Sequence, residues 1–293
     1  MNTSTRTVTP PGSATAPASP VWTLGAAAAL AAVLAVLHTF VQATPTIDAL
    51  MAGDTPAESQ QGLRMMWHGM SAIAWTCPVV LLLLRQAPAA AARPVLGFVA
   101  VLNGSQAVFY AAAALVLLWA DGSFGSLSLL PWALHAPVAV LAWLARPSRP
   151  ERQTPPPARR RGRLVLLWST TVLAAVMAAF HLIQGTFMSW PAEVLASDTT
   201  SPAKPALYVM WLFSCVVFLS VPVAVVWSLR APAAAGRFVV RYAAVLVAAL
   251  MVSWFVEVTF VSGDDLQPSG WVVLGLLATL TALSAPPRNR SNT

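Results

Sequence analysis

Five ionisable side chains stand inside strongly apolar stretches of this chain of 293 residues, and their types could do chemistry. An ionisable group inside a bilayer is costly, so it usually marks a ligand, ion or proton site. At about 1.5 Å of helix per residue, all five lie in one layer near the outer surface, with the third slightly deeper. They are His38, His68, His135, His181 and Glu257.

Three of these histidines, His38, His68 and His135, belong to the first half of the chain. Neutral imidazole is a common metal ligand and a haem axial ligand, and a four-helix bundle can hold haem between histidines on facing helices. The sequence therefore predicts a haem b or metal site with these ligands, in which Asn103 and Gln106 donate hydrogen bonds that orient the imidazoles. The alternative is that the histidines only hydrogen-bond across helices and hold the bundle together.

A second metal hypothesis centres on the start of the second predicted helix, where Met66 and Met70 are four residues apart and share a face. His68 lies between them, and thioether with imidazole suits copper(I). The alternative is that these methionines are flexible apolar filling. Met210 repeats Met66 without a neighbouring histidine, which favours the filling.

Glu257 suggests a different function. A carboxylate at this depth usually faces a cavity or a partner, and paired with His181 it would suit a proton-coupled secondary transporter. Alternatively, Glu257 reaches the nearby outer surface along its own alkyl chain. Glutamines follow two of the histidines at helical spacing and are further polar candidates: Gln42 after His38 and Gln184 after His181.

The elements that must position these residues are transmembrane helices. Hydrophobic residues make up 57% of the chain and charged residues 9%, against about 25% charged residues in soluble domains. We therefore expect an all-α integral membrane protein with eight spans of about 20 residues each. The expected spans are 21–43, 64–84, 95–119, 126–145, 164–187, 207–229, 238–261 and 269–285.

The chain also repeats itself after 144 residues. Ala87–Arg93 reads APAAAAR and Ala231–Arg237 reads APAAAGR, and the same shift carries Pro78 onto Pro222. This predicts two tandem four-helix repeats inserted in parallel, related by an axis along the membrane normal. The predicted parts are a disordered N-terminus (1–20), a first repeat (21–146), a basic Pro-rich linker (147–162), a second repeat (163–285) and a tail (286–293).

The polar side chains are concentrated in the first repeat. Asn103 and Gln106 map onto Val247 and Leu250, and the last predicted helix has no histidine to match His135. This pattern favours one site in the first repeat, with the second repeat as a supporting half.

Charge sets the expected orientation. Nearly all of the 17 Lys and Arg residues fall on alternate connections, so the positive-inside rule places both termini and the linker in the cytoplasm, with the protein in the inner (plasma) membrane. The basic linker would contact anionic lipid heads rather than nucleic acid. Tryptophans near the predicted helix ends, Trp67 among them, indicate an aromatic belt.

The segments 44–63 and 188–206 are the longest expected outer loops. The chain has no nucleotide-binding loop, HExxH or GxSxG motif, which disfavours ATP-driven transport, proteolysis and serine hydrolysis. A non-catalytic membrane scaffold remains the third functional alternative.

Overall fold

The computed structural model describes residues 21–121, 126–147, 161–187, 193, 196–198, 203–261 and 269–286, and every regular element within them is helical. The predictions for the N-terminus (1–20), most of the linker (147–162) and nearly all of the tail (286–293) fall outside the described residues. The main helices are α1 (Val21–Val36), α2 (Ala43–Ala52), α3 (Ala57–Leu83), α4 (Ala89–Asp121), α5 (Ser126–Leu144), α6 (Arg161–Phe187), α8 (Ala203–Ser228), α9 (Ala233–Val256) and α10 (Ser269–Ser284).

Three short helical turns extend these helices. A π-helical turn, η1 (Leu37–Val41), continues α1, and a 3₁₀ turn, η2 (Leu84–Gln86), continues α3. A second π-helical turn, η3 (Glu257–Val261), continues α9. Both π turns hold an ionisable residue, since η1 contains His38 and η3 starts at Glu257. Such turns are rare and often occur at functional sites.

Six helices are long and apolar enough to cross a membrane, which indicates a multi-pass membrane protein. Two further helices, α5 and α10, have shorter apolar stretches in the described part, Ala133–Leu144 and Val272–Ser284. The six candidate spans are Trp22–Ala52, Ala57–Gln86, Ala89–Leu115, Gly162–Ile183, Lys204–Ser228 and Ala233–Val261.

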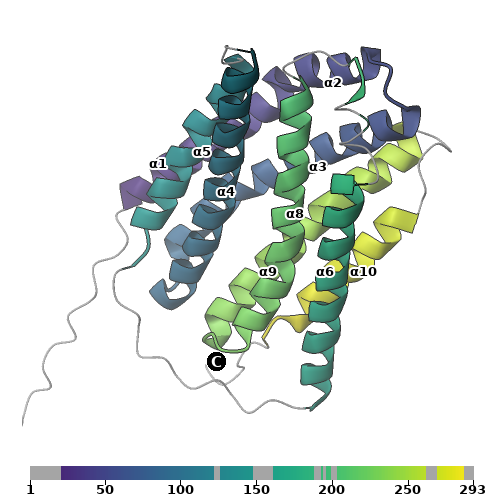
Figure 1. The fold of residues 1–293 in the computed structure, drawn as a ribbon. Helices are drawn as coiled ribbons and strands as arrows, with labels where there is room; N and C mark the ends of the chain where they lie inside the picture. The colour runs from purple at the N-terminus through teal and green to yellow at the C-terminus, as the bar shows by residue number, and fades with distance from the viewer. Residues whose placement is uncertain are drawn as a thin grey trace, which may run out of the picture.

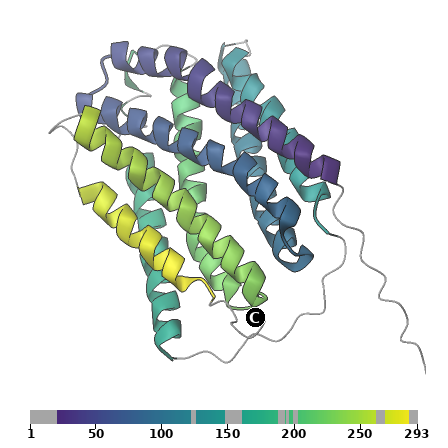
Figure 2. The same cartoon turned by 180° about the vertical axis from the view of Figure 1, so that it is seen from behind.

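The helices pack side by side in one bundle (Figures 1 and 2). In the centre, α3 and α4 pack against α8 and α9. The helices α1 and α5 pack together on one side of this centre, against α3 and α4, and α6 and α10 pack together against α8 and α9. The first half of the chain therefore meets the second half mainly through α3 and α4 on one side and α8 and α9 on the other.

One element contradicts the sequence prediction of an open outer loop over 44–63. The helix α2 occupies Ala43–Ala52 and packs against α8, η1 and α3, and α3 itself begins at Ala57. Pro45 and Asp48 made this segment read as a loop, but proline is tolerated in the first turn of a helix. As a result, a helix follows directly after the turn that carries His38, at the α2 end of the bundle (Figure 1).

The seam between α3 and α9 joins the two halves closely. At Gly69 the two helices lie so close together that a Cβ atom on this residue would be only 2.7 Å from Cδ2 of Leu250. Small residues allow such close helix packing in membranes. Further along the seam, the hydroxyls of Thr76 and Tyr242 lie 3.3 Å apart. Side chains of the second half can therefore reach the interior of the first.

Several contacts recur between residues that are 144 positions apart. The backbone N–H of Asp54 donates to Oδ1 of Asp198 at 3.0 Å, and the N–H of Asp198 donates to Oδ1 of Asp54 at 2.9 Å. A reciprocal contact of this kind is what a two-fold axis between two equivalent residues produces. Two further hydrogen bonds recur under the same shift: Gln60 to Gly53 matches Lys204 to Ser197, and Thr76 to Ile73 matches Ser220 to Val217.

Candidate functional site

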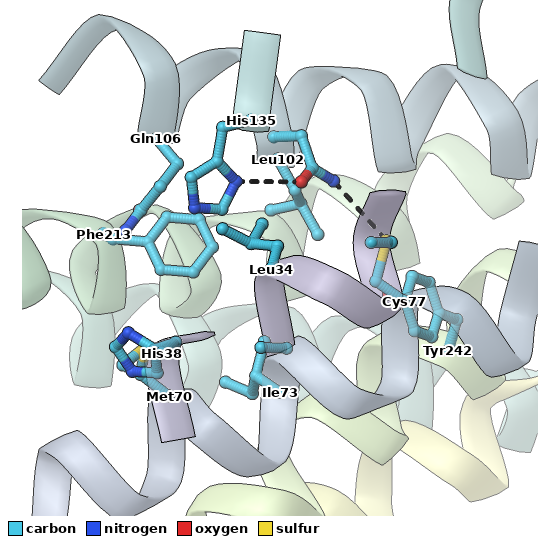
Figure 3. A pocket seen from close by; sticks show the side chains of 13 residues that line it. Leu34, His38, Met70, Ile73, Cys77, Leu102, Gln106, His135, Phe213 and Tyr242 are labelled. Carbon is cyan, nitrogen blue, oxygen red and sulfur yellow. Dashed lines mark hydrogen bonds between the residues drawn. The ribbon is translucent and has the colours of Figure 1, made fainter. Parts of the chain in front are cut away.

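A cavity of about 50 Å³ lies inside the bundle, chiefly among helices of the first half (Figure 3). Figure 3 shows His38 and Met70 at one end of the view, and His135 with Gln106 at the other. The helices α8 and α9 of the second half add Phe213 and Tyr242. The lining residues with polar or sulfur atoms are His38, Met70, Cys77, Asn103, Gln106, His135 and Tyr242.

His38 is held in place by Trp67. Their ring centroids are 4.2 Å apart with an interplanar angle of 19°, and the His38 ring also hydrogen-bonds the backbone carbonyl of Trp67. His38 is only 8% exposed, and its Nε2 atom is buried with no hydrogen-bond partner among the described residues. Because Nε2 is free, the bond to the carbonyl uses Nδ1–H, and Nε2 carries the lone pair of a neutral imidazole.

His135 is oriented by Asn103, since its Nδ1 lies 3.0 Å from Oδ1 of that residue. The amide nitrogen of Asn103 donates to the carbonyl of Val99 at 3.0 Å and to Sγ of Cys77 at 3.6 Å. These two acceptors fix the amide orientation, so Oδ1 faces His135 and accepts from Nδ1–H. The remaining ring nitrogen of His135, Nε2, therefore also carries a lone pair.

Other polar groups at the cavity make it suitable for a small polar occupant. Oε1 of Gln106 is buried with no hydrogen-bond partner among the described residues. Pro78 lies inside α3 and lacks the N–H that would bond the carbonyl of Ala74, which is one of the lining residues. The volume of this mainly apolar cavity, which carries a few polar atoms in its wall, exceeds the roughly 10–15 Å³ that one water needs. It has room for a few waters, or for one ion.

The second half contains a similar histidine–tryptophan pair, in which Nε2 of the imidazole already has a hydrogen-bond partner. The rings of His181 and Trp211 stack at 4.1 Å with an interplanar angle of 16°. Nε2 of His181 lies 2.6 Å from Oγ of Ser214, whose hydroxyl donates to the Trp211 carbonyl at 2.6 Å. Because the Ser214 hydroxyl proton is used in the bond to the Trp211 carbonyl, the Ser214 oxygen accepts from Nε2–H of His181. Nε2 of His181 therefore has no lone pair available for a ligand. Met70 is the counterpart of Ser214 under the 144-residue shift.

The structure does not bring His68 to the predicted three-histidine site. His68 is exposed and does not line the cavity, while its neighbour Trp67 is 1% exposed. Successive helical residues point about 100° apart, so turning Trp67 toward His38 turns His68 outward. Trp67 is buried, so it does not belong to the predicted aromatic belt. The predicted copper ligands do not share one site either, because Met70 lines the cavity and Met66 and His68 do not.

Glu257 has a partner that the sequence analysis did not foresee. Nε of Arg64 donates to Oε1 of Glu257 at 2.7 Å, and the two side chains form an ion pair between α3 and η3. Glu257 is 3% exposed, so it does not reach the outer surface, and the contacts of His181 are with Trp211, Phe218 and Ser214. The predicted pairing of Glu257 with His181 is therefore corrected.

The two glutamine candidates have different outcomes. Gln42 is buried and its side chain lies next to His38, as the helical spacing indicated. The side chain of Gln184 lies outside the described part of the structure.

One signal in the sequence could have revealed the stacked pairs. The 144-residue shift aligns Trp67 with Trp211, and with one residue gained or lost it aligns His38 with His181. A histidine and a tryptophan at matching positions in both halves of the sequence indicate a contact. Arg64, Ser214, Cys77 and Tyr242 gave no such signal, because their roles depend on how each helix is rotated.

The donors at the cavity are neutral and few. Among the residues that the structure describes, no three His, Cys, Asp or Glu side chains are placed to hold one metal ion, and no carboxylate lines the cavity. The nitrogen donors are the two imidazoles, and the thioether of Met70 and the thiol of Cys77 add sulfur. Comparisons of the chain with protein-family models, with curated proteins and with solved structures find no match.

Proposed function

We propose that this protein binds a single transition-metal ion inside the membrane, with Nε2 of His38 and Nε2 of His135 as ligands. The observation that carries the proposal is the buried Nε2 of His38, which has no partner among the described residues at a cavity that His135 also lines. Because leaving a buried polar atom unpaired costs about 1–3 kcal/mol, an occupant that pairs with Nε2 is favoured.

The hydrogen bonds behind the two rings support a metal site. A histidine that binds a metal usually donates its other ring N–H to a carbonyl or carboxylate, which fixes the tautomer and the ring orientation. His38 has such a bond to the carbonyl of Trp67, and His135 has one to the amide oxygen of Asn103. A histidine that only holds two helices together has no need of a free and buried Nε2.

The size of the cavity favours an ion over haem b. Pockets for organic ligands usually enclose roughly 300–1,000 Å³, whereas this cavity encloses about 50 Å³. Haem would need the helices around His38 and His135 to separate. We therefore expect no Soret band in the absorption spectrum of the purified protein, and a Soret band that disappears in His38→Ala would favour haem instead.

We also propose that the chain crosses the membrane eight times as two parallel four-helix repeats. The reciprocal contact between Asp54 and Asp198 and the recurring hydrogen bonds support this architecture. So do the two stacked pairs, His38 with Trp67 and His181 with Trp211. In this architecture α5 and α10 are the fourth and eighth spans.

The charge pattern supports a place in the inner (plasma) membrane with both termini in the cytoplasm. The basic linker (147–162) would then contact anionic lipid heads. Reporter fusions to the two termini and to the 188–206 segment test this orientation, and a terminus reported outside the cytoplasm would contradict it.

Metal retention by purified protein in lipid nanodiscs tests the proposed function. The protein is incubated with copper, zinc or nickel, desalted, and analysed by mass spectrometry for metal per chain. We expect about one ion per chain for at least one metal, lost in both His38→Ala and His135→Ala. His181→Ala and His68→Ala are the matched controls and should retain the ion.

Two outcomes would overturn this proposal. One is retention of no metal by folded protein, and the other is retention that is unchanged in His38→Ala and His135→Ala. Uptake that follows a proton gradient and is lost in Glu257→Gln would favour the transporter alternative. A protein with neither property would be a membrane scaffold.

A further inference from the structure

We infer that the ion bound between His38 and His135 is monovalent copper, which enters a site of low coordination number and no net charge. This inference rests on the proposed function and deepens it by naming the class of ion. Three properties of the cavity carry it: the number of donors, their charge and their softness.

The number of donors is too small for the common divalent ions. Among the described residues the cavity offers two imidazoles, one thioether and the thiol of Cys77, whose Sγ accepts a hydrogen bond from Asn103. No three His, Cys, Asp or Glu side chains of the described residues are placed together to hold one ion. Zinc in structural sites takes four protein ligands, and copper(II) prefers four or more in a tetragonal arrangement. Copper(I) is a d¹⁰ ion without a ligand-field preference, and it is stable with two or three ligands.

Charge points the same way. None of the described residues that line the cavity carries a carboxylate, and the buried carboxylate of Glu257 is neutralised by its ion pair with Arg64. The free energy needed to move an ion from water into a medium of low dielectric constant rises with the square of its charge. A divalent ion therefore meets about four times the desolvation penalty of a monovalent ion, with no carboxylate among the described lining residues to offset it.

The sulfur donor adds selectivity for a soft ion. Thioether ligands favour copper(I) over zinc and nickel, and Met70 lines the cavity with His38. In the second half the counterpart of Met70 is Ser214, whose hydroxyl oxygen is hydrogen-bonded to Nε2 of His181. The same position is thus a soft donor in one half and a hydrogen-bond partner in the other.

A competition experiment on full-length protein in nanodiscs tests the inference. Copper(I), kept reduced with ascorbate under anaerobic conditions, is titrated against a chromophoric copper(I) chelator, and zinc and copper(II) are measured separately. We expect one equivalent of copper(I) with at least 100-fold tighter binding than zinc. Silver(I), a monovalent soft ion that is not reduced or oxidised under these conditions, should compete for the same site.

Two matched methionine variants sharpen the test. Met70→Leu keeps the side-chain volume and removes the thioether, so we expect at least tenfold weaker copper(I) binding and loss of the sulfur signal in copper X-ray absorption. Met66→Leu changes an equally buried methionine of α3 that does not line the cavity, and it should bind copper(I) normally. Unchanged copper(I) binding in folded Met70→Leu would contradict thioether ligation.

The outcomes separate the two proposals. Binding of zinc or copper(II) as tight as that of copper(I), and still lost in His38→Ala, overturns the choice of a monovalent ion and leaves the proposed metal site standing. Binding of no ion by folded protein overturns both.

Discussion

The two halves of the chain contain the same histidine–tryptophan stack, but they differ in whether Nε2 of the imidazole has a hydrogen-bond partner. In the first half the His38 ring bonds the Trp67 carbonyl and leaves Nε2 free, whereas in the second half Nε2 of His181 is bound to Ser214. The ring geometries are nearly identical, with centroid separations of 4.2 Å and 4.1 Å. The stack is therefore a feature of the scaffold, and the neighbours of the ring decide whether it can bind anything.

Few residues make this difference. Met70 in the first half stands where Ser214 stands in the second, and Asn103, which orients His135, stands where the second half has Val247. Each change removes a hydrogen-bonding group from one half or adds one to the other. The two halves thus share the stacked pair, while the unpartnered imidazole nitrogen is seen in the first half and not in the described part of the second.

The largest expected effect concerns the ion pair that joins the halves. Its counterparts in the other half are Tyr208 for Arg64 and Ala113 for Glu257, so it exists once. Arg64→Ala leaves the carboxylate of Glu257 buried without its cation, and we expect a loss of about 3–5 kcal/mol of stability. Unfolding in SDS, followed by tryptophan fluorescence, measures this loss.

A double variant provides the control for that prediction. Arg64→Leu combined with Glu257→Leu removes both charges, and it should recover most of the stability that Arg64→Ala loses. Wild-type stability in Arg64→Ala would mean that Glu257 finds another partner, and that this contact does not hold the halves together.

The next effect concerns the residue that positions His135. Asn103→Leu removes the acceptor for Nδ1–H, and we expect metal affinity to fall by about 10–100-fold, as for other groups that orient a ligating histidine. Asn103→Asp keeps an acceptor oxygen and should retain most of the affinity. If Asn103→Asp binds as weakly as Asn103→Leu, packing and not the hydrogen bond is what Asn103 contributes.

A smaller effect is expected in the second half, at the hydrogen bond between His181 and Ser214. Ser214→Ala releases Nε2 of His181, and the lost hydrogen bond should cost about 1 kcal/mol, since hydrogen bonds between membrane helices average roughly 0.6 kcal/mol and reach about 1.7. Metal retention should stay at one ion per chain, because this half has no counterpart of His135. A second ion bound in Ser214→Ala would contradict this expectation and show that Ser214 alone prevents His181 from binding an ion.

The smallest effect is expected at the reciprocal contact near the outer loops. Asp54→Ala and Asp198→Ala each remove one exposed hydrogen bond between the halves, and we expect each to cost less than about 0.5 kcal/mol. Unfolding in SDS should give equal losses for the two variants if the residues are equivalent. A large loss in only one of them would contradict that equivalence.

Hydropathy was enough to predict where the apolar helices lie. The predicted spans at 21–43 and 238–261 correspond to α1 with η1 and to α9 with η3. The helix α2 was missed because its ten residues include Pro45 and Asp48 and are too few for a span. Its contacts with α8 and α3, which hydropathy does not record, hold it in place.

The candidate site was predicted in part, and the errors have one cause. Depth along a helix can be counted from its ends, and three of the residues expected at one site, His38, His135 and Gln106, line one cavity. Rotation about the helix axis cannot be counted in that way, and an error of one residue turns a side chain by about 100°. His68 was therefore expected beside His38, where Trp67 lies instead.

The partner of Glu257 was missed for a related reason. Arg64 was read as a charge near an outer loop, because the second span was expected to begin there, but α3 begins at Ala57 and places Arg64 two turns inside a helix. The arginine thus faces η3 across the seam between the halves. Which helices meet at that seam is a matter of packing, and the hydropathy of each segment alone does not determine it.

The most direct test of the difference between the halves is the position of a heavy monovalent ion in a crystal of the protein. Crystals loaded with silver(I) should give one anomalous peak, bridging Nε2 of His38 and Nε2 of His135 with Met70 beside it, and none at His181. A peak beside His181 and Trp211, a peak at exposed His68 with the cavity empty, or no ordered silver at all would contradict the account.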